Sequence, residues 1–202
     1  MPAMILQINK PPKAGYFSHV FFTEDNRVVK LFLKKEGAAF TAEAPQNPDD
    51  NIVVSRAVWE SECEAYELVT KMPTLVELIP RYFKREIIKD VIGKSGQSIA
   101  SSYILDCAYS LEYIPGSDFK VNEYRGPLRD EITSAVERLR QAGVNYVHDA
   151  SVIIDPNGSI FRLIDFGTWD AQMELSTELT FNLRLSDDMR AKWGSPKEDR
   201  RE

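Results

Sequence analysis

Three charged residues have the types and the order that phosphoryl transfer requires. Asp165 lies in residues 163–167, LIDFG, where a strand-like run releases a carboxylate onto a glycine. Such a position suits a magnesium ligand. Lys30, far upstream, can bind phosphate oxygens, and Asp149, shortly before Asp165, can orient an attacking hydroxyl. Their order along the chain predicts ATP-dependent phosphoryl transfer.

The lysine lies inside an apolar strand-like run and needs an anion. Residues 28–33, VVKLFL, surround Lys30 with apolar side chains. A lysine on such a face requires a carboxylate partner, or else extends to solvent at a sheet edge. The next predicted helix offers Glu60, Glu62 and Glu64. We select Glu62, because it lies on the apolar side of that helix, and its ion pair would fix the lysine for phosphates.

Two further segments are candidates for nucleotide binding. Residues 15–20, GYFSHV, lie at a strand turn, where Gly15 permits close approach to a phosphate and Ser18 adds a hydroxyl donor. An ordinary β-turn is the alternative. Residues 111–116, LEYIPG, join an apolar strand to Pro-Gly, and their backbone groups can hydrogen-bond a planar base. A plain strand end is the alternative here.

Residues 146–154, YVHDASVII, present polar side chains just before a buried strand. We expect His148 to be a structural hydrogen-bonding residue rather than a general base. Ser151 lies where a second metal ligand is needed, although a neutral hydroxyl is a poor ligand for a hard cation. Asp149 and Asp165 are expected at one end of neighbouring strands. Two carboxylates there would repel each other unless a cation, such as magnesium carrying nucleotide phosphates, lay between them.

Size and composition restrict the class of protein. The chain has 202 residues, which suits one large domain or two small lobes around a cleft. Its net charge of -6 argues against nucleic acid or anionic membranes as partners. No run approaches the roughly 20 apolar residues of a membrane span, and the start lacks a signal-peptide core. We therefore expect a cytoplasmic protein, or one delivered into a host cell without a cleavable signal peptide.

The apolar periodicity predicts a mixture of strands and helices. Cys63 and Cys107 fall within these apolar patterns, and buried free thiols are preferred to a disulfide or metal pair. The predicted elements are strands near Ile5 and over 16–23 and 28–33, a loop over 36–51, a helix over 56–71 capped by Ser55, strands over 82–92 and 102–113 joined by a turn, a helix from Leu128 to a stop at Gly143, strands over 152–154 and 160–164, and a helix over 176–193.

Together these segments resemble the protein-kinase-like superfamily from Gly15 to Gly167. GYFSHV resembles the glycine-rich loop, with Lys13 at its first glycine and Ser18 at its last. VVK resembles the strand-lysine motif, and LEYIPG resembles the hinge. AGVNYVHDAS is similar to the catalytic loop, and LIDFG to the metal-binding motif. The helix with Glu62 corresponds to the regulatory helix.

The resemblance implies an α+β, two-lobed fold, with a small antiparallel-sheet N-lobe over 1–114 and a reduced helical C-lobe over 115–202. It implies ATP and Mg2+ as cofactors. The residues it implies are Asp149 and Lys30 for catalysis; Gly15, Ser18, Val20, Lys30, Glu62, Glu112 and Ile114 for ATP binding; and Asp165 and Ser151 for the metal.

The chain departs from the family pattern at two places. His148 and Asp149 are adjacent, and no asparagine follows them before the strand. Little chain follows Gly167, so the usual helical lobe cannot fit. We predict a minimal protein Ser/Thr kinase with a protein substrate. The alternatives are a small-molecule kinase, a pseudokinase that binds nucleotide or protein, and a nucleotidyl transferase.

Overall fold

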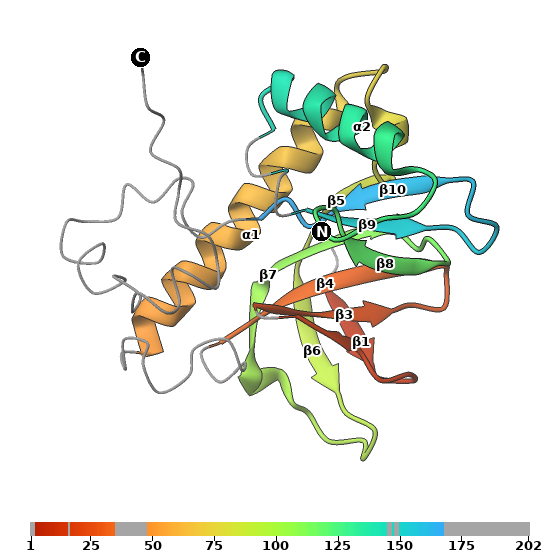
Figure 1. Cartoon of the computed structure of the whole chain (residues 1–202). Coiled ribbons are helices and arrows are strands. Elements are labelled where there is room, and N and C mark those ends of the chain that lie inside the picture. The colour runs from red at the N-terminus through yellow and green to blue at the C-terminus, as the bar shows by residue number, and fades with distance from the viewer. Residues whose placement is uncertain (1–2, 16, 35–47, 145–146, 148–149, 168–202) are drawn as a thin grey trace.

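The computed structural model describes residues 3–15, 17–34, 48–144, 147 and 150–167 (Figure 1). These residues form strands paired mainly in antiparallel fashion, together with two α-helices. The fold class is therefore α+β, as predicted. The predicted helix over 176–193 lies outside the described residues, and the division into lobes at 114 stays a prediction.

The largest sheet has five antiparallel strands, and helix α1 packs against one of its faces (Figure 1). Successive side chains of the central strand point to opposite faces of the sheet. Because this strand has apolar side chains on both faces, each face of the sheet can pack against other parts of the protein. One face packs against α1, and the other carries a separate apolar cluster. In spatial order the strands are β2 (Lys13–Ala14), β3 (Ser18–Phe22), β4 (Arg27–Leu33), β7 (Tyr103–Glu112) and β5 (Tyr82–Glu86), and α1 spans Pro48–Thr70.

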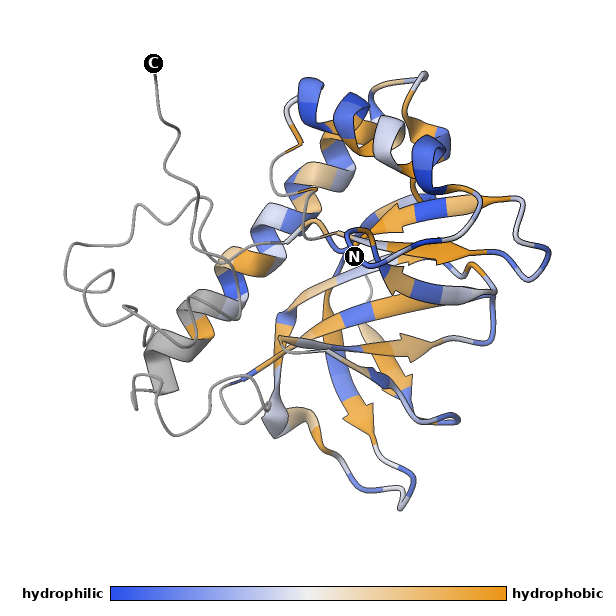
Figure 2. Cartoon of the chain, viewed as in Figure 1, coloured by the Kyte–Doolittle hydropathy of each residue, from blue (hydrophilic) through white to orange (hydrophobic). Residues whose placement is uncertain are grey.

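Two smaller sheets complete the described fold. One pairs two strands in parallel, and the other has three antiparallel strands beside α2 (Figure 1). Figure 2 shows hydrophobic residues along these strands and mostly hydrophilic residues on the visible side of α2. The elements are β1 (Met4–Gln7), β6 (Ile88–Ile92), β8 (Ser117–Lys120), β9 (Ser151–Ile154), β10 (Phe161–Ile164), α2 (Arg129–Gln141) and the 3-10 turns Val76–Leu78 and Ala100–Ser102.

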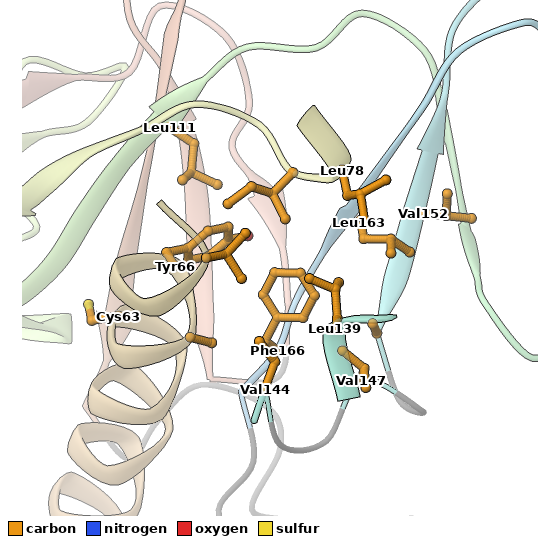
Figure 3. Packing of buried hydrophobic residues seen from close by; sticks show 14 of the residues in the cluster. Cys63, Tyr66, Leu78, Leu111, Leu139, Val144, Val147, Val152, Leu163 and Phe166 are labelled. Carbon is orange, nitrogen blue, oxygen red and sulfur yellow. The ribbon is translucent and has the colours of Figure 1, made fainter. Parts of the chain in front are cut away.

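One apolar cluster joins the five-stranded sheet, both α-helices and the three-stranded sheet. Figure 3 shows Phe166 at its centre, near Tyr66 of α1 and Leu139 of α2. Leu111, before the predicted lobe boundary, and Leu163, after it, belong to the same cluster. The site residues at the end of β10 are thus anchored in a core that includes α1 and the large sheet. Both cysteines are buried and free, as predicted.

Three sequence predictions need correction. Helix α1 begins at Pro48 rather than after Ser55, because proline is tolerated in the first turn, where a backbone N–H has no partner within the helix. The strand predicted over 82–92 is two strands, and the exposed Ile87 lies between them. Finally, β8 was not predicted, since its four exposed residues show no apolar alternation.

Candidate functional site

Lys30 lies at the centre of the site, on the face of β4 that packs toward α1. In the sheet it pairs with Val20 of β3 and Tyr109 of β7. Its Nζ donates to Glu62 Oε1 at 2.6 Å and to Asp165 Oδ1 at 2.9 Å. Only 15% of the Lys30 side chain is exposed. Burial disfavours the charged ammonium, but Asp165 and Glu62 outweigh it and raise the pKa of Lys30. The ammonium is therefore charged at neutral pH.

Glu62 is the predicted partner of this lysine, and the contact is confirmed. Glu60 instead pairs with Arg85, at 2.7 Å, and Glu64 is exposed. Glu62 is 1% exposed and accepts hydrogen bonds from Lys30 on Oε1 and from the Tyr109 hydroxyl on Oε2. Burial raises its pKa to about 7, although Lys30 opposes the rise. Both oxygens are occupied, which fixes the carboxyl group and, through it, the lysine.

Asp165 reaches the lysine because the backbone turns sharply after β10. Its φ of 69° lies in the left-handed region, which costs a non-glycine residue energy and requires support from the surroundings. Phe166 supplies that support: it is fully buried, with its ring edge-on to Tyr66 at 5.2 Å. Gly167 packs so closely on Glu62 that an added Cβ would lie 2.4 Å from Oε1. The segment 165–167 is thus locked against α1.

A second lysine, Lys120, which no sequence pattern indicates, contacts Asp165. Lys120 Nζ lies 3.5 Å from Asp165 Oδ2, on the side of the carboxylate away from Lys30. Burial would raise the pKa of Asp165, but Lys30 and Lys120 outweigh it and lower that pKa to about 2. Lys120 is brought there by β8, where it pairs with Ser151 of β9, which in turn pairs with Ile164 of β10. A short exposed strand gives little signal in sequence, so only the register reveals this lysine.

The predicted phosphate-loop residues lie beside the strand that carries Lys30. The backbone N–H of Gly15 donates to Ser18 O at 2.8 Å, which closes a tight turn between β2 and β3. Ser18 is buried, and Val20 is adjacent to Lys30 in register. An ion pair between Lys13 and Asp118 links this hairpin to β8. Asp118 and Lys120 lie two residues apart on β8, so their side chains are on the same face of the strand. The hairpin therefore contacts the face of β8 that carries the second lysine.

The predicted hinge lies at the end of β7. Glu112 N donates to Arg81 O at 2.9 Å, and Tyr113 N donates to Asn26 O at 3.0 Å, so both amides are used within the protein. Ile114 makes no hydrogen bond within the described part of the chain. Of these three backbone amides, that of Ile114 is therefore the one not already used within the described part of the chain.

The described residues do not by themselves make a magnesium site. Within the parts of the chain that the structure describes, no group of three or more His, Cys, Asp or Glu side chains could hold a metal ion. Both oxygens of Asp165 contact ammonium groups, and Ser151, 9% exposed, adds only a hydroxyl. His148 and Asp149 lie outside the described residues. The roles of Asp149, Ser151 and Asp165 at a metal stay predictions.

Comparison with known proteins does not identify a family for this chain. No protein-family model, no curated protein and no solved structure matches this chain. Among the described helices, none combines the length and the apolar character that crossing a bilayer requires. The protein-kinase-like resemblance therefore rests on residue types and on their order along the chain, and it stays a prediction.

Proposed function

We propose that this protein is an ATP-dependent phosphotransferase of the protein-kinase-like type, which transfers the γ-phosphate to a hydroxyl. The observation that supports this proposal is the position of Lys30 Nζ, 2.6 Å from Glu62 and 2.9 Å from Asp165. These three residues come from β4, from α1 and from the turn after β10. A lysine held between two carboxylates is an arrangement in which an ammonium is fixed and charged before a phosphate arrives.

Lys30 has a donor to offer a nucleotide. An ammonium has three N–H donors, and two of them bind Glu62 and Asp165. The third can donate to a phosphate oxygen, which gives a charge-assisted hydrogen bond. Glu62 holds the lysine in place, and the amide of Ile114 can meet the base. Asp149 is proposed to orient the acceptor hydroxyl.

The proposed architecture is two-lobed, with the nucleotide between an N-lobe over 1–114 and a reduced C-lobe over 115–202. A protein serine or threonine is the preferred acceptor, as in the protein kinases that the chain resembles. A small-molecule hydroxyl is the alternative acceptor. The resemblance also implies Mg2+, for which the described residues offer only Asp165 and Ser151. No step proposed above depends on the metal.

A second candidate function is nucleotide binding without phosphoryl transfer, as in a pseudokinase. The observation that favours it is Lys120 Nζ, 3.5 Å from Oδ2 of Asp165, the carboxylate that would be needed to hold a catalytic metal. The adjacent His148 and Asp149 in the shortened loop favour it as well. The two functions share the nucleotide site and differ in whether phosphate leaves the nucleotide.

Phosphate transfer from γ-labelled ATP to a panel of protein and small-molecule acceptors tests the proposal. The wild type should label an acceptor, whereas Lys30→Met and Asp165→Asn should lose most transfer, and Ser151→Ala should lose less. Glu64→Gln, an exposed change on the same helix as Glu62, should leave transfer unchanged. Circular dichroism checks that each variant is folded.

Three results would change the conclusion. ATP binding without transfer to any acceptor would favour the pseudokinase. Label that is transferred from the α-phosphate rather than the γ-phosphate would indicate a nucleotidyl transferase. Full transfer by Asp165→Asn would refute the role of Asp165.

A further inference from the structure

Asp165 has an ammonium group on each of its two carboxylate oxygens. Lys30 Nζ lies 2.9 Å from Oδ1, and Lys120 Nζ lies 3.5 Å from Oδ2. Lys30 belongs to the buried part of the site, because Glu62 shields it. Lys120 lies at the open edge, where its side chain is 45% exposed and that of Asp165 is 40% exposed. The second lysine is thus where an incoming phosphate chain would first meet the site.

A divalent cation would compete with Lys120 for the same oxygen. Magnesium binds carboxylate oxygens at close range and with strict octahedral geometry, so an ammonium 3.5 Å from Oδ2 opposes its binding there by charge. Within the described ranges no cluster of three metal-ligating side chains provides another position. Lys120 already supplies a positive charge at the carboxylate, which is what the metal would contribute there.

The position of Lys120 is built into the fold. Its backbone is paired with Ser151 in the three-stranded sheet, one strand away from Ile164, which directly precedes Asp165. On the same face of β8, Asp118 forms an ion pair with Lys13 of the β2–β3 hairpin. The strand that carries Lys120 is therefore held by the sheet that also presents Asp165, and the exposed ion pair adds a contact with the β2–β3 hairpin.

We propose that Lys120 acts as the counter-cation of this site, so that the protein binds a nucleoside triphosphate without a divalent metal ion. This inference rests on the proposed function, since it concerns the same nucleotide site. Lys30 binds the phosphate chain from the buried side and Lys120 from the open side. A partly exposed ion pair contributes little free energy, so the contact between Lys120 and Asp165 can give way to a contact with a phosphate oxygen at small cost.

Calorimetric titration of the full chain with ATP, in EDTA and in magnesium chloride, tests the proposal. The wild type should bind ATP in EDTA with a Kd within about threefold of its value in magnesium. Lys120→Met should weaken binding in EDTA by about tenfold or more, because a charged hydrogen bond to phosphate is lost. Lys120→Arg should retain most of the affinity. Lys89→Met, which removes an exposed lysine from β6, should bind as the wild type does.

The outcomes separate this inference from the proposed function. ATP binding that requires magnesium, with γ-phosphate transfer intact, would refute metal-free binding and leave the phosphotransferase standing. Lys120→Met that binds in EDTA as tightly as the wild type would refute the role of Lys120. Absence of ATP binding in both buffers would refute both proposals. If Lys120→Met does not melt cooperatively, Lys120→Arg decides: loss of binding in EDTA by that folded variant also contradicts the proposal.

Discussion

Replacement of Glu62 by glutamine should change how the stability of the protein depends on pH. Glu62 is 1% exposed, and burial raises its pKa from 4.5 to about 7, although Lys30 opposes this. In the unfolded chain the carboxyl loses its proton near its ordinary pKa. Between these two values the folded state holds a proton that the unfolded state has released, so stability falls as pH rises through this window.

The size of the effect follows from the two pKa values. Each pH unit between them is worth about 1.4 kcal/mol. The rise from 4.5 to about 7 therefore corresponds to about 3 kcal/mol of unfolding free energy that the wild type loses between those pH values. Glu62→Gln cannot ionise and keeps a similar volume, so it should not show this loss. Its amide oxygen can still accept from Lys30, and its NH2 group, in the place of Oε2, can donate to the Tyr109 hydroxyl oxygen.

Urea denaturation from about pH 5 to about pH 8 measures this difference. The quantity of interest is the unfolding free energy of Glu62→Gln minus that of the wild type, in which contributions from other titrating groups, such as His19, cancel. We expect the difference to increase with pH. Glu64→Gln, on the exposed side of α1, should follow the wild type at every pH. A difference that stays constant, or that decreases with pH, would refute the claim that burial dominates at Glu62.

Three further substitutions test the packing around the site, each by urea denaturation. Gly116→Ala places a Cβ 2.1 Å from the backbone oxygen of Ile154, so we expect a loss of about 2 kcal/mol or more; unchanged stability would contradict this close approach. Phe166→Ala removes a fully buried ring and should cost about 3 to 5 kcal/mol, whereas a cost below about 1 kcal/mol would place the ring outside the core. Gly167→Ala directs a Cβ at Glu62 and should cost about 1 to 3 kcal/mol while also weakening ATP binding; normal ATP affinity would show that the two residues are not coupled.

Local patterns were sufficient to predict the strands that carry the site. The run 28–33 and the run ending at Ile164 are apolar, bounded by turns, and form β4 and β10. Pairing across long separations was harder. The parallel pairing of β1 with β6 leaves no mark in either segment, because a register is set by tertiary packing and not by the strand alone. The helix start at Pro48 was missed because the polar segment over 36–51 reads as a loop.

The site shows the same division between local and tertiary information. Lys30 and Glu62 could be paired from sequence, because each is a charged residue on an otherwise apolar face and requires a partner. The Tyr109 hydroxyl also donates a hydrogen bond to Glu62. A tyrosine in an apolar strand is common, so this contact could not be inferred from the sequence. In the sequence Lys120 cannot be distinguished from a solvated lysine. Only the pairing of β8 with β9, and of β9 with β10, shows that it lies beside Asp165.

The position of α1 determines the state of Lys30 through two contacts at once. Glu62, on α1, binds the lysine directly. Asp165 binds it from a turn in which Phe166 packs on Tyr66 and Gly167 packs on Glu62, and both of these partners also belong to α1. A shift of the helix would therefore remove one carboxylate and release the turn that presents the other. The two contacts of Lys30 should therefore form and break together. The position of the lysine ammonium then depends on one interface, the packing of α1 against the turn 165–167.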